Sequence, residues 1–139
     1  MRQAFETIEI STTGRGFTEI TDQVRSCLKS SGLVEGAVTL HVQHTSASLL
    51  IQENADPEVR DDFERFFARL CPDGDGLFRH TYEGPDDMPA HIRSALTCVN
   101  TTIPFQAGSM MLGTWQGIYL WEHRTHAHRR RVVLYFCGE

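Results

Sequence analysis

The sequence predicts a single domain of the α+β class. The expected order is strand, helix, strands, two helices and then a strand meander, so helices do not alternate with strands as they do in wound α/β folds. The strands are predicted from alternation of apolar and polar residues, and the helices from apolar residues at helical spacing. With 40% hydrophobic and 22% charged residues, the 139-residue chain suits one globular domain over residues 1–139.

Four elements are predicted before residue 53. Residues 5–11 alternate between apolar and polar and indicate a strand. Apolar residues over 20–28 recur at helical spacing, and Gly32 can end that helix. Alternation returns over 37–44 and 47–52, which predicts two further strands.

The second half is predicted to contain two helices and three strands. Asp56-Pro57 has the residue types of a helix cap and first helical position, and Pro72 ends that helix. Glycines, prolines and acids over 72–87 indicate a loop, and the next helix is expected to run from near Asp87 to include Val99. The remaining strands are expected near 109–112, 117–123 and 132–137.

The bulk properties exclude several classes of protein. A net charge of −5 and a pI near 5.8 argue against nucleic-acid binding. No apolar run reaches the length of a membrane span, and the N-terminus has no signal-peptide core, so no membrane association is expected. Four cysteines without short spacing indicate a reduced, cytoplasmic protein. The basic residues cluster at Arg124 and Arg129 to Arg131, which suits a small anionic ligand.

Two predicted strand faces end in an ionisable residue. Alternation places His44 on the face of Val38, Leu40 and Val42, and it places Glu122 on the face of Ile118 and Leu120. An inward ionisable group is costly unless it is paired, bound to a metal or in a wet pocket. His44 and Glu122 therefore indicate a functional site.

The segment from His44 to Ser48 combines an imidazole with three hydroxyl residues. Thr45 and Ser46 at a strand end can offer oxygens and backbone N–H groups to an anion. The alternative is a polar turn that caps itself through its own hydroxyl groups.

Asp87 and His91 are four residues apart at the predicted start of a helix. If Asp87 is helical, its carboxylate lies beside the imidazole, an arrangement that suits a metal ligand or a general base. Alternatively, Asp87 only caps the helix and His91 is half exposed. His80 lies in the long loop and carries little weight by itself.

Three further residues are candidates for binding a substrate. Trp115 and Gln116 lie between glycines that allow close approach of the backbone, and the indole can stack on a planar ring. The alternative for Trp115 is an ordinary place in the core or an interface. Arg124 can clamp a phosphate, or it can neutralise Glu122 in an ion pair.

The candidate segments follow one order along the chain: HTSAS, ENADPEVR, RH, DDMPAHIRSAL, TIP, GTWQGIYLWEHR and RRRVV. In this order, from about Phe5 to Gly138, they resemble the YjbQ-like family, also called the secondary thiamine-phosphate synthase family. The resemblance implies an antiparallel β-sandwich core with about three flanking helices, assembly into homotrimers, and weak thiamine-phosphate synthase activity. That reaction joins a pyrimidine pyrophosphate to a thiazole phosphate and releases pyrophosphate.

The resemblance maps motif residues onto this chain, among them a motif glutamate onto Glu122, and the chemistry of the residues gives them expected roles. The family's motif histidines map onto His44, His80 and His91, which would hold a divalent metal such as zinc. Asp87 would support that metal or complete its ligands, and Glu122 would be a general base or a supporting group. The predicted substrate-binding residues are Thr45, Ser46, Trp115, Gln116 and Arg124.

The chain departs from the family after Glu122, where it reads His123 to His128 in place of an acid and a Gly-Pro turn. No role is carried onto those histidines. The chain also lacks the Asp-rich cluster that typically holds Mg²⁺ against a pyrophosphate, so thiamine-phosphate synthesis is expected to be a weak or side activity. The alternatives are a metal- or anion-binding module without turnover, and a purely structural trimer.

Overall fold

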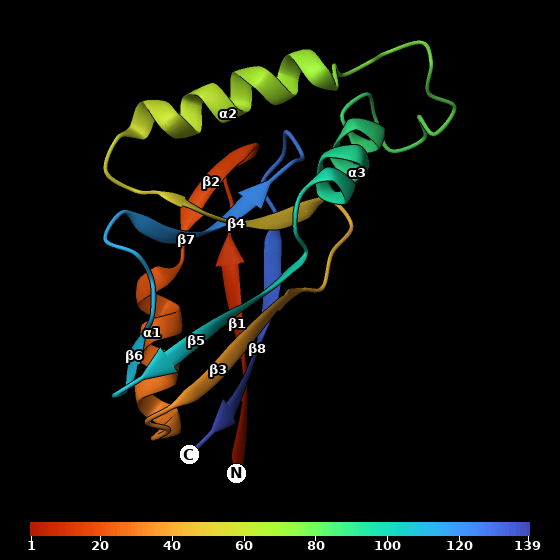
Figure 1. Ribbon diagram of the computed structural model, residues 1–139. Coiled ribbons are helices and arrows are strands. Elements are labelled where there is room, and N and C mark those ends of the chain that lie inside the picture. The colour runs from red at the N-terminus through yellow and green to blue at the C-terminus, as the bar shows by residue number, and fades with distance from the viewer.

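Eight strands form two antiparallel sheets in the computed structural model, which describes residues 1–139 (Figure 1). The large sheet has five strands, in the spatial order β1 (Arg2–Ser11), β8 (Arg129–Gly138), β3 (Gly36–Val42), β5 (Asn100–Gln106) and β6 (Ser109–Met110). The small sheet has three strands, in the order β2 (Gly16–Glu19), β7 (Gln116–Glu122) and β4 (Ala47–Glu53).

The three helices are α1 (Thr21–Ser31), α2 (Pro57–Leu70) and α3 (Asp87–Leu96). Gly32 ends α1 in the left-handed conformation, with φ of 68°, which glycine adopts without steric cost. Asp56 caps α2 through a 2.9 Å hydrogen bond from the amide of Glu58. None of these helices combines the length and the apolar character that crossing a bilayer demands.

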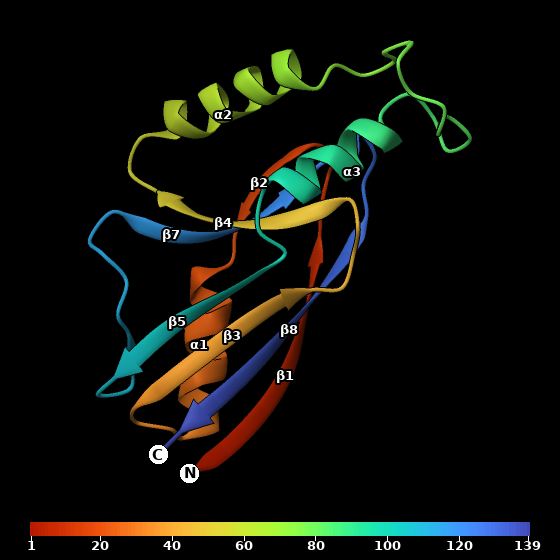
Figure 2. The same ribbon diagram turned by 45° about the vertical axis from the view of Figure 1, so that its right-hand side comes forward.

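The core lies between the large sheet and a second layer made of α1 and the small sheet (Figure 2). Alternation along β3 sends Val38 and Leu40 to the inner face of the large sheet, and alternation along β7 sends Ile118 and Leu120 to meet them. Val24 of α1 is also fully buried in this core. Glu122 continues the inward face of β7, so a charged group reaches the edge of the core.

The other face of the small sheet is aromatic and is covered by α2. Phe17 stacks on Trp121 with ring centroids 4.4 Å apart, and Phe67 of α2 meets Trp121 edge-on at 4.9 Å. Glu64 of α2 accepts hydrogen bonds from the Trp121 indole and, at 3.0 Å, from Arg93 of α3. These contacts position α2 although none of its own residues is fully buried.

The predicted α+β sandwich with three helices is confirmed, whereas several element boundaries and two strands differ from prediction. The third helix was expected to include Val99 but ends at Leu96, because the backbone of 98–99 bonds to β3 and β4 and leads into β5. The strands β2 and β5 were not predicted. Residues 37–44 form a strand only as far as Val42, and the strand near 109–112 is limited to Ser109–Met110.

Candidate functional site

The end of β7, the start of β8 and the start of α3 lie close together (Figure 1), and buried polar and charged side chains gather there. The loop between β3 and β4, residues 43–46, also contacts this region, through hydrogen bonds to His91 and Arg130. The packing brings together segments that are far apart in the sequence, and most of the predicted site residues lie here.

Asp87 is the centre of a group that also contains His80 and His91. Its Oδ2 lies 2.8 Å from Nε2 of His80 and 3.2 Å from Nε2 of His91. One ligand atom from each residue falls within 4.8 Å of the others. The predicted contact between Asp87 and His91 across one helical turn is therefore confirmed, and the loop adds His80 to it.

Backbone contacts fix which nitrogen of His91 carries its proton. Nδ1 lies 3.0 Å from the carbonyl oxygen of Thr45. A carbonyl only accepts hydrogen bonds, so Nδ1 carries the N–H and neutral His91 presents a lone pair at Nε2. That lone pair faces the carboxylate of Asp87, a repulsive contact unless Nε2 is also protonated or a cation lies between the two groups. Two imidazole nitrogens and a carboxylate oxygen are a donor set that fits a divalent transition metal.

Arg124 holds the other carboxylate oxygen of Asp87. Its Nη1 donates to Asp87 Oδ1 at 2.9 Å, its Nε donates to Asp86 Oδ2 at 2.9 Å, and its Nη2 donates to the Glu83 carbonyl at 2.9 Å. Burial alone would raise the pKa of Asp86, but hydrogen bonds from Arg124 and Thr125 hold it well below its usual range. Arg124 thus orients Asp87, rather than pairing with Glu122 through its side chain or reaching out to a phosphate.

Glu122 forms a buried ion pair with Arg130. Oε1 accepts from Arg130 Nε at 2.9 Å and from Thr12 Oγ1 at 2.7 Å, and Oε2 accepts from Arg130 Nη2 and from the amide of Arg124. Burial raises the pKa of Glu122, but these hydrogen bonds outweigh it and lower the pKa overall. A carboxylate that is ionised and surrounded by donors suits a positioning role better than that of a general base.

Arg130 also ties this ion pair to the loop between β3 and β4. Its Nη2 donates to Ser46 Oγ at 2.9 Å and to the Ser46 carbonyl at 3.2 Å. Ser46 is buried, whereas Thr45 beside it is exposed. Of the two predicted anion-binding hydroxyls, only that of Thr45 is therefore open to a ligand.

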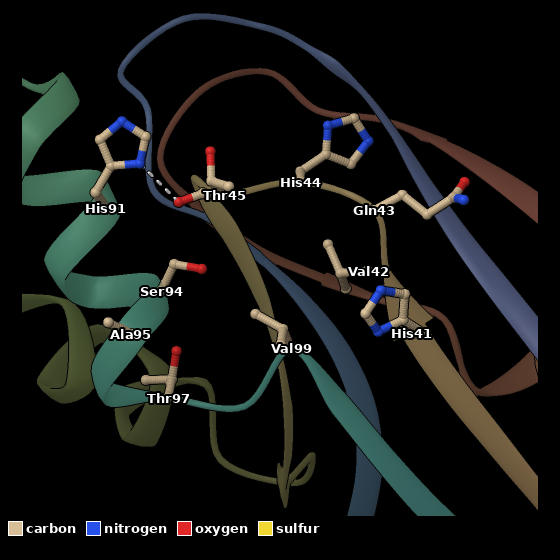
Figure 3. A pocket seen from close by; sticks show the side chains of 10 residues that line it. All are labelled: His41, Val42, Gln43, His44, Thr45, His91, Ser94, Ala95, Thr97 and Val99. Atoms are coloured by element: carbon tan, nitrogen blue, oxygen red, sulfur yellow. Dashed lines mark hydrogen bonds between the residues drawn. The ribbon is translucent and has the colours of Figure 1, made fainter.

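A cavity of about 550 Å³ opens between this loop and α3 (Figure 3). Its lining residues are His41, Val42, Gln43, His44, Thr45, His91, Ser94, Ala95, Thr97 and Val99. The rings of His44 and His91 stand on either side of Thr45. The cavity has the size of a small-molecule site and adjoins the group around Asp87.

His44 lies outside the group formed by His80, Asp87 and His91. Its Nε2 accepts a 2.9 Å hydrogen bond from the backbone amide of Arg131, so the ring keeps its proton on Nδ1. An imidazole with one nitrogen used as an acceptor and the other protonated has no lone pair for a metal. The structure therefore does not place His44 with the two histidines predicted to share a metal with it.

Trp115 and Gln116 lie at the opposite end of β7 from Glu122. The indole is 62% exposed, and the Gln116 side chain accepts a 2.7 Å hydrogen bond from the amide of Gly113. At a strand rise of about 3.3 Å per residue, the two ends of β7 are about 20 Å apart. Within one chain, the structure does not bring these two predicted substrate-binding residues to the histidines.

Sequence reasoning did not single out three residues that support the site. Thr12 and Asp86 hold Glu122 and Arg124, and His123 Nε2 lies 2.7 Å from Ser48 Oγ in the interior. Asp86 and His123 are next to predicted site residues in the sequence, and this proximity could have indicated their roles. Thr12 carries no such signal, because its partner is 110 residues away.

We expect the buried His123 to make the protein sensitive to mild acid. Burial and, secondarily, the charge of Arg93 lower its pKa to about 3. The unfolded chain, with a histidine pKa of about 6.5, binds more protons between these values, so stability is lost as pH falls from about 6.5 toward about 3. At a pH of about 5 this loss is about 2 kcal/mol.

Urea unfolding of the wild type and His123→Gln, each at neutral pH and at a pH of about 5, measures this effect. His123→Gln should lose about 2 kcal/mol less than the wild type on acidification. His126→Gln, which changes an exposed histidine, should retain the full loss. An equal loss in His123→Gln and in the wild type would contradict the assignment.

The fold and the site define a class of protein: a two-sheet α+β domain with a His–Asp–His group beside a small-molecule-sized cavity. Residues 6–139 match the family described as UPF0047 protein YjbQ-like. The chain belongs to this family, as its motifs predicted.

Related sequences and structures agree with this assignment. The chain is 48% identical to the UPF0047 protein sll1880 of Synechocystis sp., over 99% of this chain and 94% of that protein. It is 45% identical to the UPF0047 protein YjbQ of Escherichia coli O157:H7, over 96% of this chain and 97% of that one. The crystal structure of the conserved hypothetical protein TT1486 from Thermus thermophilus is similar with a TM-score of 0.83 and 34% identity, covering 93% of this chain and 97% of that one.

Proposed function

We propose that this protein is an enzyme that acts on a small phosphorylated or heterocyclic molecule and holds a divalent metal such as zinc at His80, Asp87 and His91. The observation that carries the proposal is the convergence of one ligand atom from each of these residues within 4.8 Å. The position of His91 Nε2 beside the Asp87 carboxylate supports it, because either a second proton or a bound cation makes that contact favourable.

The surrounding residues suit a site for chemistry rather than packing alone. Arg124 engages Asp87 Oδ1 and so leaves Oδ2 to the histidines. A divalent metal in this position would polarise a carbonyl or phosphoryl oxygen. The adjoining cavity of about 550 Å³ offers room for a small substrate, with the Thr45 hydroxyl at its rim.

Within this proposal, thiamine-phosphate synthesis is a weak or side activity. The family resemblance is the reason to propose it. The arrangement of the acids is the reason to rank it low: Asp86 is neutralised by Arg124, and Asp87 is shared between Arg124 and the histidines. No free pair of carboxylates therefore remains here to hold Mg²⁺ against a departing pyrophosphate.

A second candidate is a metal- or small-anion-binding module without turnover. Full occupation of the Glu122 oxygens favours it, because the most buried carboxylate of the site is not free to move a proton. The two candidates share the metal and the cavity and differ only in chemistry.

Elemental analysis of the untagged protein, followed by an assay for pyrophosphate release, tests the proposal. We expect about one transition-metal ion per chain. We also expect slow release of pyrophosphate from the pyrimidine pyrophosphate and thiazole phosphate pair, abolished by a chelator and restored by the metal. A bound metal without turnover on these or other phosphorylated compounds would favour the binding module. A protein that takes up no divalent metal would overturn the proposal.

We also propose that the protein assembles as a homotrimer, as the resemblance implies. The outer face of the large sheet supports this, because no helix covers it and Phe5, 67% exposed, pairs there with Tyr135 at 4.8 Å. Sedimentation equilibrium should give three times the chain mass of 15.8 kDa. Phe5→Glu is expected to shift the protein to the monomer, whereas a monomeric wild type would contradict the assembly.

A further inference from the structure

The start of β8 extends beyond the end of β3, and a backbone group that β3 leaves without a strand partner fixes the tautomer of His44. Both the N–H and the C=O of Arg131 face β3, but β3 ends at Val42. The Arg131 carbonyl accepts from the amide of Gln43 at 3.1 Å, and its amide donates to Nε2 of His44 at 2.9 Å. A backbone N–H only donates, so the proton of neutral His44 lies on Nδ1.

His44 and His91 therefore offer different groups to the cavity from its two sides, although both carry their proton on Nδ1. The Thr45 carbonyl accepts a hydrogen bond from the Nδ1–H group of His91, so Nε2 of His91 keeps a lone pair, which suits a cation. The Arg131 amide donates a hydrogen bond to Nε2 of His44, so the Nδ1–H group of His44 remains free to donate to an acceptor. In Figure 3 the Nδ1 edge of the His44 ring lies on the side of Thr45 and His91, and the Thr45 hydroxyl stands between the two rings.

The charge around His44 favours an anionic acceptor over a neutral one. Arg131 and Arg129 are exposed at the start of β8, and His128 lies beside them. Two carboxylates lie close by: Glu122 is neutralised by Arg130, and Glu9 lies 3.7 Å from Arg129, which leaves the charge of Arg131 in excess. Positive charge at this rim is therefore in excess.

We propose that His44 is a specificity residue of this cavity that recognises an anionic oxygen of the ligand, such as that of a phosphate group, by donating the Nδ1 proton. This inference rests on the proposed function, since the same ligand would contact the metal on the His91 side. The ligand class that follows is a small molecule with a phosphate or similar oxyanion, placed between the His44 N–H and the metal group. The Thr45 hydroxyl is the second donor to that oxyanion.

Nitrogen-15 NMR of the full-length labelled protein tests the tautomers directly. The expected result is a protonated Nδ1 and an unprotonated Nε2 in His44, and the same tautomer in His91. Zinc should shift the Nε2 resonance of His91 and leave both nitrogens of His44 unchanged. Inorganic phosphate added afterwards should shift the Nδ1 resonance of His44. A protonated Nε2 in His44, or a direct zinc shift there, would overturn the inference.

Two substitutions separate the two edges of the His44 ring. His44→Asn keeps an N–H near the position of Nδ1 and should retain phosphate affinity. His44→Gln keeps an acceptor for the Arg131 amide but loses that donor, and should weaken phosphate binding by about tenfold or more. His126→Ala, which changes an exposed histidine outside the cavity, is the matched control and should bind phosphate like the wild type.

The outcomes distinguish this inference from the proposed function. The tautomers are read in the metal-free protein, so a failure to bind metal overturns the proposed function without changing that reading. Equal phosphate affinity in His44→Asn and His44→Gln, or a zinc-loaded wild type that binds neither phosphate nor pyrophosphate, overturns the recognition role of His44.

Discussion

Replacing Glu122 by glutamine is expected to lower the free energy of unfolding by about 3–5 kcal/mol. Glu122 is 1% exposed and Arg130 is 4% exposed, so the pair is shielded from water. The amide has nearly the shape of the carboxylate but no charge, and the Arg130 guanidinium would remain buried without a counterion. Urea unfolding at a fixed protein concentration measures the loss, because assembly would make stability depend on concentration.

A surface ion pair provides the matched control for Glu122→Gln. Arg129 and Glu9 lie 3.7 Å apart with side chains that are 80% and 53% exposed, so Glu9→Gln should cost less than about 1 kcal/mol. The double replacement Glu122→Leu with Arg130→Met should recover much of the loss, since it removes both charges together. A cost for Glu122→Gln no larger than that for Glu9→Gln would show that the buried pair does not hold this corner of the fold.

The inward position of Glu122 could be predicted from alternation along one strand, but its partner could not. Arg130 belongs to a run of three arginines, of which β8 turns the middle one inward and the outer two to solvent. The run was interpreted as a basic cluster suited to a small anionic ligand, and the strand was predicted to begin only near residue 132, because the arginines carry no apolar pattern. Extending the alternation back from Val132 by one more step would have placed Arg130 inside.

The predictability of the candidate site followed the distance between partners in the sequence. Asp87 and His91 were paired correctly because a helix fixes the geometry of residues four apart. His80 reaches them from a loop, and no periodicity states where a loop side chain will point. His44 was assigned to the same group because the family resemblance maps a motif histidine onto it. Its ring is set by the backbone of Arg131, 87 residues away, which sequence spacing cannot reveal.

Among single substitutions, His91→Ala and Asp87→Ala are expected to have the largest effect on metal binding. Each removes one of the three converging ligand atoms. Loss of a supporting residue near a metal typically lowers affinity about 10–100-fold, so loss of a ligand should lower it by at least about 100-fold. Titration of zinc into the chelator-treated protein, followed by calorimetry, measures the affinity. Asp87→Asn adds a useful comparison, because it keeps the shape of the side chain and an oxygen while removing the charge.

His44→Ala is the control that decides between the ligand set expected from the family resemblance and the one found in space. If His44 is not a ligand, this variant keeps the zinc affinity of the wild type, while His80→Ala and His91→Ala lose it. Loss of zinc affinity in His44→Ala without unfolding would mean that the ring leaves the Arg131 amide and turns Nε2 to the metal. That result would restore a three-histidine centre and would remove His44 as an N–H donor. The zinc affinity of this one variant therefore determines whether the cavity presents one imidazole to a cation and another to an anion, or both to the same ion.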